Sequence, residues 1–130
     1  MKTSKFLKCG EIYCRDELRR AFGIQDATLN NGIFKPHGHD SVWLFVTENK
    51  TPDRTPYKDR LSQNDLYMEG QTRGRTDSLI TEHRSRGLEL LLFYREDKSQ
   101  YEHASFRFEG IFRYISHQGS RPIEFHLARS

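Results

Sequence analysis

The sequence has few of the features that mark membrane, secreted or disulfide-bonded proteins. No apolar run approaches the roughly 20 residues that cross a bilayer, and the amino end lacks the apolar stretch of a secretory signal. Cys9 and Cys14 are too few for a disulfide framework or a four-cysteine zinc site. The four prolines and nine glycines form no tract, linker or repeat. We therefore expect residues 1–130 to form a single cytoplasmic globular domain.

Aromatic and basic side chains are well represented. Nine Phe, six Tyr and one Trp exceed the aromatic content of a disordered linker. The formal net charge is only +3, but 14 of the 21 basic residues are Arg. Because the planar guanidinium group matches phosphates and base edges, this bias favours a nucleic-acid partner. A mixed, soluble surface that is rich in Arg is an equally weighted alternative.

Two segments have the pattern of short helices. Residues 14–23 place apolar side chains on one face, with Cys14 at the N-cap and Glu17 three residues later as its reciprocal partner. Residues 74–87 are predicted to form a second short helix. The segment before the first helix, residues 1–11, is predicted to be a loose amino-terminal arm.

The remainder of the chain has mainly the pattern of β-strands. One of them is nearly all apolar, as in a central strand that is covered on both faces, and another contains Gly110 at a predicted bulge. The predicted strands cover residues 42–47, 66–71, 88–95, 106–115 and 123–128. These elements predict an α+β fold, with a curled, barrel-like, mostly antiparallel sheet of five to seven strands and two or three short helices.

The common catalytic and metal-binding motifs are absent. His37 and His39 would point the same way on an extended segment, beside Asp40, but no third ligand can be named. The Glu–x–Lys at 48–50 precedes Asp53, the reverse of the order in one nuclease class. A histidine-and-asparagine (HNH) nuclease unit, a Gly-rich phosphate loop and a nucleophile elbow are also missing. We therefore predict no catalysis by this chain alone, no metal and no cofactor.

Polar and aromatic side chains gather in the middle of the sequence. Rings that stack on a nucleobase, carboxylates or amides that pair with its edge, and arginines that hold the backbone are what a base-binding site needs. Alternatively, the two tyrosines pack in the core and Asp59 caps or pairs with a neighbouring arginine. The stretch comprises Arg54, Tyr57, Lys58, Asp59, Arg60, Tyr67, Glu69, Gln71, Arg73, Arg75 and Asp77.

The order of these segments resembles an SRA-like domain. This SET- and RING-associated type is related to PUA domains, and the closest likeness is to the variant appended to modification-dependent HNH or helicase-nuclease restriction enzymes. The resemblance covers about residues 12–128. Four motifs carry it together: Tyr–x–Asp at 57–59, aromatic–x–Glu–Gly–Gln at 67–71, Leu–Phe–Tyr–Arg at 92–95 and Phe–x–Phe–x–Gly at 106–110.

The resemblance implies a reader of modified double-stranded DNA, with a nuclease domain in cis or in trans. Such domains flip a 5-substituted cytosine into a pocket, where Asp59 would accept the amino proton and Tyr57 and Tyr67 would stack on the ring. The implied base-binding residues are Trp43 (an alternative ring), Tyr57, Asp59, Tyr67, Glu69 and Gln71. The implied phosphate-binding residues are Arg54, Lys58, Arg73, Arg75, Arg84 and Arg86.

Two other functions stay open at this point. The first is a PUA-like reader of modified RNA that uses the same aromatic pocket. The second is a small protein or enzyme that binds a free nucleotide or metabolite. Binding to matched DNA and RNA oligonucleotides separates the first, and binding of a mononucleoside that is insensitive to salt would favour the second.

Overall fold

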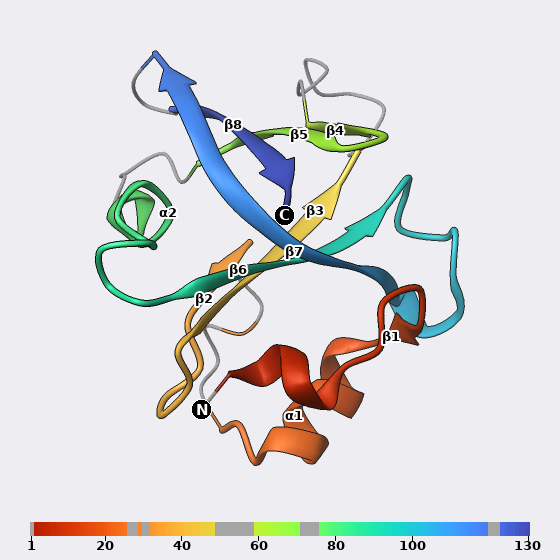
Figure 1. The fold of residues 1–130 in the computed structure, drawn as a ribbon. Helices are drawn as coiled ribbons and strands as arrows, with labels where there is room; N and C mark the ends of the chain where they lie inside the picture. Colours follow the sequence, from red (N-terminus) through yellow and green to blue (C-terminus); the bar gives the residue numbers. More distant parts are fainter. Residues whose placement is uncertain (1, 26–28, 30–31, 49–58, 71–75, 120–122) are drawn as a thin grey trace.

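Within the described residues, the chain forms eight β-strands, two α-helices and two short 3-10 helices (Figure 1). The structure is a computed structural model that describes residues 2–25, 29, 32–48, 59–70, 76–119 and 123–130. The predicted α+β class is confirmed. The helices are η1 (Thr3–Phe6), α1 (Arg15–Phe22), α2 (Asp77–Thr81) and η3 (Glu102–Ala104). The strands are β1 (Ile12–Tyr13), β2 (Ile33–Phe34), β3 (Ser41–Thr47), β4 (Arg60–Ser62), β5 (Asp65–Glu69), β6 (Glu89–Arg95), β7 (Phe106–Gln118) and β8 (Glu124–Arg129).

The strands form one sheet in the order β2-β3-β6-β7-β8-β5-β4, and β1 pairs with β7. Only the β3–β6 pair is parallel among the strands described, so the mostly antiparallel prediction is confirmed. Within the same residues, the end strands β2 and β4 do not pair with each other. The sheet is therefore open, and the barrel-like prediction is not supported. The strand number exceeds the predicted five to seven because β1 and β2, with two residues each, are too short to show an alternating pattern.

Apolar side chains cover both faces of the central strands β3 and β6. Leu44 and Leu90 belong to a first core, to which β5 and β8 also contribute apolar side chains. The long strand β7 curves across the sheet and connects these strands to the central ones (Figure 1). Trp43 and Phe93 belong to a second core on the opposite face, which α1 closes with Leu18. Each of these fully buried side chains contributes roughly 1.5–3 kcal/mol through the hydrophobic effect.

A β-bulge in β7 lets this strand supply both cores. Gly110 lies opposite Leu92 but Phe108 lies opposite Phe93, so Glu109 is an extra residue in β7. The predicted bulge at Gly110 is confirmed, and its φ of 97° is one that glycine adopts readily. Because of this extra residue, side chains of even number point to one face of the sheet before the bulge and to the other face after it. Phe108 therefore enters the second core, whereas Phe112 enters the first, although the two residues have the same parity.

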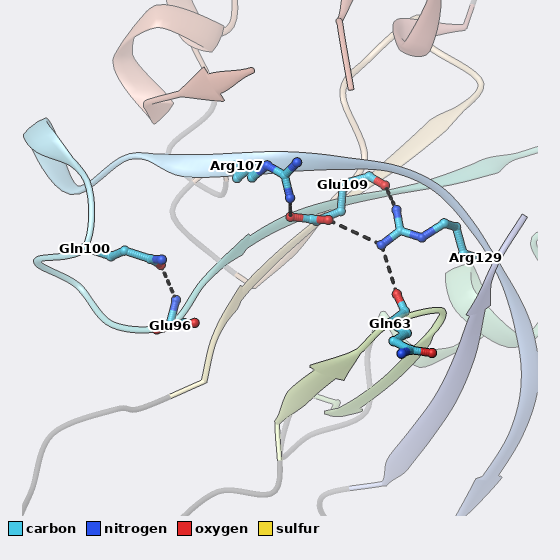
Figure 2. Close-up of polar contacts among 6 residues, drawn as sticks. All are labelled: Gln63, Glu96, Gln100, Arg107, Glu109 and Arg129. Atoms are coloured by element: carbon cyan, nitrogen blue, oxygen red, sulfur yellow. Dashed lines mark hydrogen bonds and ion pairs between the residues drawn. The ribbon is translucent and has the colours of Figure 1, made fainter. Parts of the chain in front are cut away.

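The bulge residue Glu109 also anchors the neighbouring strands (Figure 2). Glu109 is only 6% exposed, and its carboxylate accepts hydrogen bonds from Arg107 at 3.0 Å and from Arg129 at 3.3 Å. Arg129 donates in addition to the carbonyl oxygens of Glu109 and Gln63. Because both arginines share one carboxylate, the buried negative charge is compensated and β7, β8 and the β4–β5 turn are held together.

The first predicted helix is confirmed, with its N-terminal cap. The Cys14 sulfur accepts the Glu17 N–H, and the Glu17 carboxylate accepts the Cys14 N–H. The second helix is shorter than the predicted 74–87, because α2 has five residues and the chain then turns through His83. No helix in the described part of the chain is long and apolar enough to cross a membrane.

The amino-terminal arm is attached to the sheet from residue 3 onward. Thr3 is fully buried, and its N–H donates to the Ser41 hydroxyl. Ser4 donates through both its N–H and its hydroxyl to the buried carboxylate of Glu89. These hydrogen bonds hold η1 against the start of β3 and β6, so the predicted loose arm is instead a packed part of the domain.

Candidate functional site

A cavity of about 640 Å³ lies where β4, β5, β8 and the carboxyl end of β7 come together. Three of the predicted base-binding residues, Asp59, Tyr67 and Glu69, line it. They come from β5 and from the residue that precedes β4, which the antiparallel β4–β5 pairing places side by side. The sequence-predicted cluster is therefore partly assembled in one wall of a real cavity.

A row of cationic and aromatic side chains crosses three strands at this cavity. Arg60, Tyr67 and His126 lie opposite one another in the pairings of β4 with β5 and of β5 with β8. The rings of Tyr67 and His126 are stacked, with centroids 4.7 Å apart and planes at 12°. The guanidinium carbon of Arg60 lies 5.2 Å from the Tyr67 centroid, and Asp65 bonds the His126 ring at 2.9 Å. Such cross-strand pairs stabilise a sheet and present a flat stacking surface.

Four carboxylates line the same cavity: Glu48, Asp59, Glu69 and Glu124. Asp59 is only 4% exposed and accepts the backbone N–H of Glu69 at 3.0 Å. Glu124 accepts a hydrogen bond from the amide of Gln118 at 2.9 Å. Ionised carboxylates only accept hydrogen bonds, so the cavity suits a ligand edge that carries N–H or O–H donors.

Tyrosine side chains contact two of the residues that line the cavity, Glu48 and His117. Burial raises the pKa of Tyr94, and a hydrogen bond with the Glu48 carboxylate raises it further. The hydroxyl of Tyr114 is hydrogen-bonded to the His117 ring, which contacts Phe125 edge to face. These contacts fix a lining that is partly aromatic and partly acidic, as required to hold a planar polar molecule.

Trp43 lies away from the cavity. Its side chain is 0% exposed in the second core, where it contacts Phe22 and Phe34, and its indole N–H donates to the Thr3 hydroxyl. The indole is therefore committed to packing, and it does not supply the alternative stacking ring. A single tryptophan in an apolar run is more often a core residue than a ligand contact.

The predicted phosphate-binding residues that can be placed also lie outside the cavity lining. Arg84 and Arg86 are exposed on the turn after α2, where Arg86 pairs with Glu82 at 3.3 Å. The remaining predictions concern residues that the structure does not describe. These are Arg54, Tyr57, Lys58, Gln71, Arg73 and Arg75.

Sequence reasoning missed the contribution of β7 and β8. His117, Gln118, Glu124 and His126 all line the cavity. The alternation of residues 123–128 could have indicated Glu124 and His126. The residues predicted to face the core there have odd numbers, so these two even-numbered residues lie on the other face of the strand. No comparable signal marks His117 and Gln118, because a register shift after Tyr114 changes the face of that strand. Within the described residues, no three His, Cys, Asp or Glu side chains are placed so that they could hold one metal ion.

Comparison with known proteins gives a match at the level of fold. Neither a family model nor a curated protein matches the sequence. The fold is similar to part of the DNA modification-dependent restriction endonuclease AspBHI. The TM-score is 0.51 at 11% sequence identity, and the match covers 99% of this chain but 44% of AspBHI. The chain thus spans less than half of AspBHI, and at this identity the likeness to AspBHI concerns the fold alone.

Proposed function

We propose that this domain binds duplex DNA and receives a flipped, 5-substituted cytosine in the cavity. The observation that carries the proposal is the single wall in which Asp59, Tyr67 and Glu69 meet beside the stacked His126 ring. A carboxylate is the natural acceptor for the exocyclic amino group of cytosine. The cavity volume of about 640 Å³ is ample for one nucleobase and its substituent.

Energetic considerations support a flipped base over an unflipped one. Extruding a base costs a few kcal/mol of stacking and pairing. Stacking on an aromatic side chain returns about 1–3 kcal/mol per base, and a hydrogen bond to a charged acceptor adds about 1.5–3 kcal/mol. A base can extend the existing row next to His126, or stack on Tyr67 after Arg60 moves aside.

The proposed biological role is that of a specificity domain in a restriction system, without catalysis of its own. AspBHI is by name a modification-dependent restriction endonuclease, and the similar part is less than half of it. We infer that cleavage would be supplied by a nuclease domain elsewhere, in cis or in trans. Binding of modified RNA, or of a free nucleotide, is tested as an alternative outcome below.

The proposal is tested by titrating the domain with labelled duplexes of one sequence. Each duplex carries a single cytosine that is unmodified, 5-methylated or 5-hydroxymethylated, and affinity is measured by fluorescence anisotropy. We expect tighter binding to at least one modified duplex. Tyr67→Leu should abolish this preference because it removes the stacking surface, whereas Tyr67→Phe should keep it. Trp43→Phe serves as an aromatic replacement outside the cavity and should also keep it.

Equal affinity for every duplex in the panel would overturn the proposal. Stronger binding of a matched modified RNA would point to the RNA reader instead. Tight binding of a mononucleoside that does not weaken with salt would point to a small-molecule site, because binding through a nucleic-acid backbone weakens steeply as salt rises.

A further inference from the structure

Two arginines contact one aromatic ring, Phe106, which belongs to the second core. Arg15 lies in the first turn of α1 and Arg95 ends β6, and their guanidinium carbons lie 5.1 and 4.0 Å from the centroid of Phe106. Arg15 also lies 4.6 Å from the centroid of Phe45. Cation–π contacts thus hold both guanidinium groups in place. We call them the Arg15–Arg95 pair.

Most hydrogen-bond donors of the Arg15–Arg95 pair have no acceptor among the described residues. A guanidinium group has five N–H donors. Arg95, only 8% exposed, donates through Nε to the Thr47 hydroxyl at 2.8 Å and through Nη1 to the Ala104 carbonyl at 2.7 Å. The Nε of Arg15 is buried and donates to no described residue. The arrangement therefore has donor capacity that two positioned arginines could direct to a ligand.

The charge of the Arg15–Arg95 pair is also uncompensated by a close carboxylate in the described part of the chain. Arg107 and Arg129 share the buried Glu109 (Figure 2), whereas neither Arg15 nor Arg95 forms such an ion pair there. Burial, followed by repulsion from Arg95, lowers the pKa of Arg15 to about 10. Burial also lowers the pKa of Arg95, and the smaller electrostatic effect of half-buried Asp97 raises it. Each guanidinium group therefore carries a positive charge that an anionic ligand can compensate.

The backbone of Arg95 contacts a residue that lines the cavity. Strands β3 and β6 run parallel, so Thr47 and Arg95 lie opposite each other at the carboxyl ends of these two strands. The next residue, Glu48, donates its N–H to the Arg95 carbonyl at 3.0 Å and lines the cavity. A nucleic acid with one base in the cavity would therefore have backbone phosphates near the carboxyl ends of β3 and β6.

We propose that Arg15 and Arg95 form a binding site for a backbone phosphate of nucleic acid. The site is distinct from the base-binding cavity and from the arginines that the sequence suggested for phosphate. The inference rests on the nucleic-acid binding in the proposed function but not on base flipping or on recognition of a modification. Planar guanidinium groups match phosphate oxygens in a bidentate manner, which fits two arginines that the aromatic rings already orient.

The first test replaces Arg15 by Gln and measures binding of an unmodified duplex at several salt concentrations. Arg20→Gln is the matched control, because Arg20 is an exposed residue of the same helix. Loss of one phosphate contact should reduce the slope of log affinity against log salt by about 0.9. Arg15→Gln should show this reduction and weaken modified and unmodified duplexes by the same factor, whereas Arg20→Gln should leave the slope unchanged.

A folded Arg15→Gln variant with the wild-type slope would overturn the inference. Because Arg15 also packs on Phe45, a second test uses the wild-type protein: the side-chain Nε–H signals of Arg15 and Arg95 are followed by NMR. We expect both signals to shift on addition of unmodified duplex, with the Arg20 signal unchanged. Shifts with inorganic phosphate but not with duplex would overturn the assignment to a nucleic-acid backbone.

These outcomes separate the two proposals. A duplex panel without any preference for modified cytosine, combined with the expected slope change at Arg15, would remove the base-reading function and keep the phosphate site. A clear preference combined with an unchanged slope would do the reverse.

Discussion

At the scale of single residues, Asp59 combines a structural contact with a place in the cavity. The carboxylate accepts the Glu69 N–H and is almost fully buried beside Tyr67. Both interpretations considered from the sequence, a capping contact and a base contact, are therefore compatible with the same side chain. A substitution must keep the backbone contact if it is to test base binding alone.

We expect Asp59→Ala to lower the free energy of unfolding by about 1–3 kcal/mol, because the Glu69 N–H loses its acceptor. The same variant should lose the preference for modified duplex. Asp59→Asn retains an oxygen for the Glu69 N–H, so it should unfold closer to wild type while still losing affinity for the cytosine amino group. Urea denaturation and the duplex titration measure the two effects. Wild-type discrimination by Asp59→Asn would show that the carboxylate does not contact the base.

At the scale of elements, the predictions that succeeded depend on local sequence. The capping box of α1 involves Cys14 and Glu17, three residues apart, and strand β6 is recognisable from its apolar run alone. Helix α2 was predicted too long because the His83 ring bonds Leu88, just before β6, and also Tyr114 in β7, which is distant in the sequence. Tertiary contacts of this kind override local propensity.

Glycine illustrates the same limit within a strand. A bulge at Gly110 was predictable from the sequence, but its effect on the two cores depends on where β6 pairs. Gly70, which directly follows β5, was named only as part of the motif at 67–71 and not for its lack of a side chain. A Cβ atom there would lie 2.5 Å from Asp77 Oδ1, 2.7 Å from Ile123 Cγ2 and 2.9 Å from Phe125 Cε2. The close approach of β5, α2 and β8 beside the cavity therefore requires a glycine.

We predict that Gly70→Ala destabilises the protein by about 1–3 kcal/mol, the usual cost of overpacking, and weakens binding of modified duplex because Phe125 lines the cavity. Gly32→Ala is a suitable control. A Cβ atom at Gly32 would have Phe45 O as its nearest neighbour, at an ordinary 3.6 Å. Thermal or urea unfolding of both variants measures the difference. Equal stability of the two would contradict the close packing at Gly70.

At the scale of the whole molecule, the site depends on pairings that a single sequence does not reveal. Tyr67 was predicted as a base-binding residue because polar and aromatic residues lie near it in the sequence. Its stacking partner His126 comes from β8 and lies opposite it only because of the β5–β8 register. Arg15 and Arg95 likewise contact the same ring, Phe106, because α1 packs on the second core. The residue types at the site could be predicted, whereas their grouping required the three-dimensional fold.

Two histidines connect the stability of the whole domain to pH. His83 is buried: its Nε2 accepts the Tyr114 N–H at 3.1 Å, so its Nδ1–H donates to the Leu88 carbonyl at 3.0 Å, and the ring must be neutral. Burial, the largest cause, lowers the pKa of His83 below its usual value, and Arg84 lowers it further. His39 bonds the Thr3 hydroxyl, and desolvation likewise lowers its pKa.

Because both pKa values are lower in the folded state, the unfolded chain binds more protons just below about pH 6.5. We therefore predict that the free energy of unfolding falls as the pH drops from about 6.5 toward the folded-state pKa values. Urea denaturation between about pH 5 and 7.5 measures this dependence. His83→Gln places an amide oxygen near the Tyr114 N–H without a titrating ring, so it should flatten the dependence, and His39→Gln should do so in part. A wild-type stability that is constant or rises as the pH falls through this range would contradict the neutral, bridging role of His83.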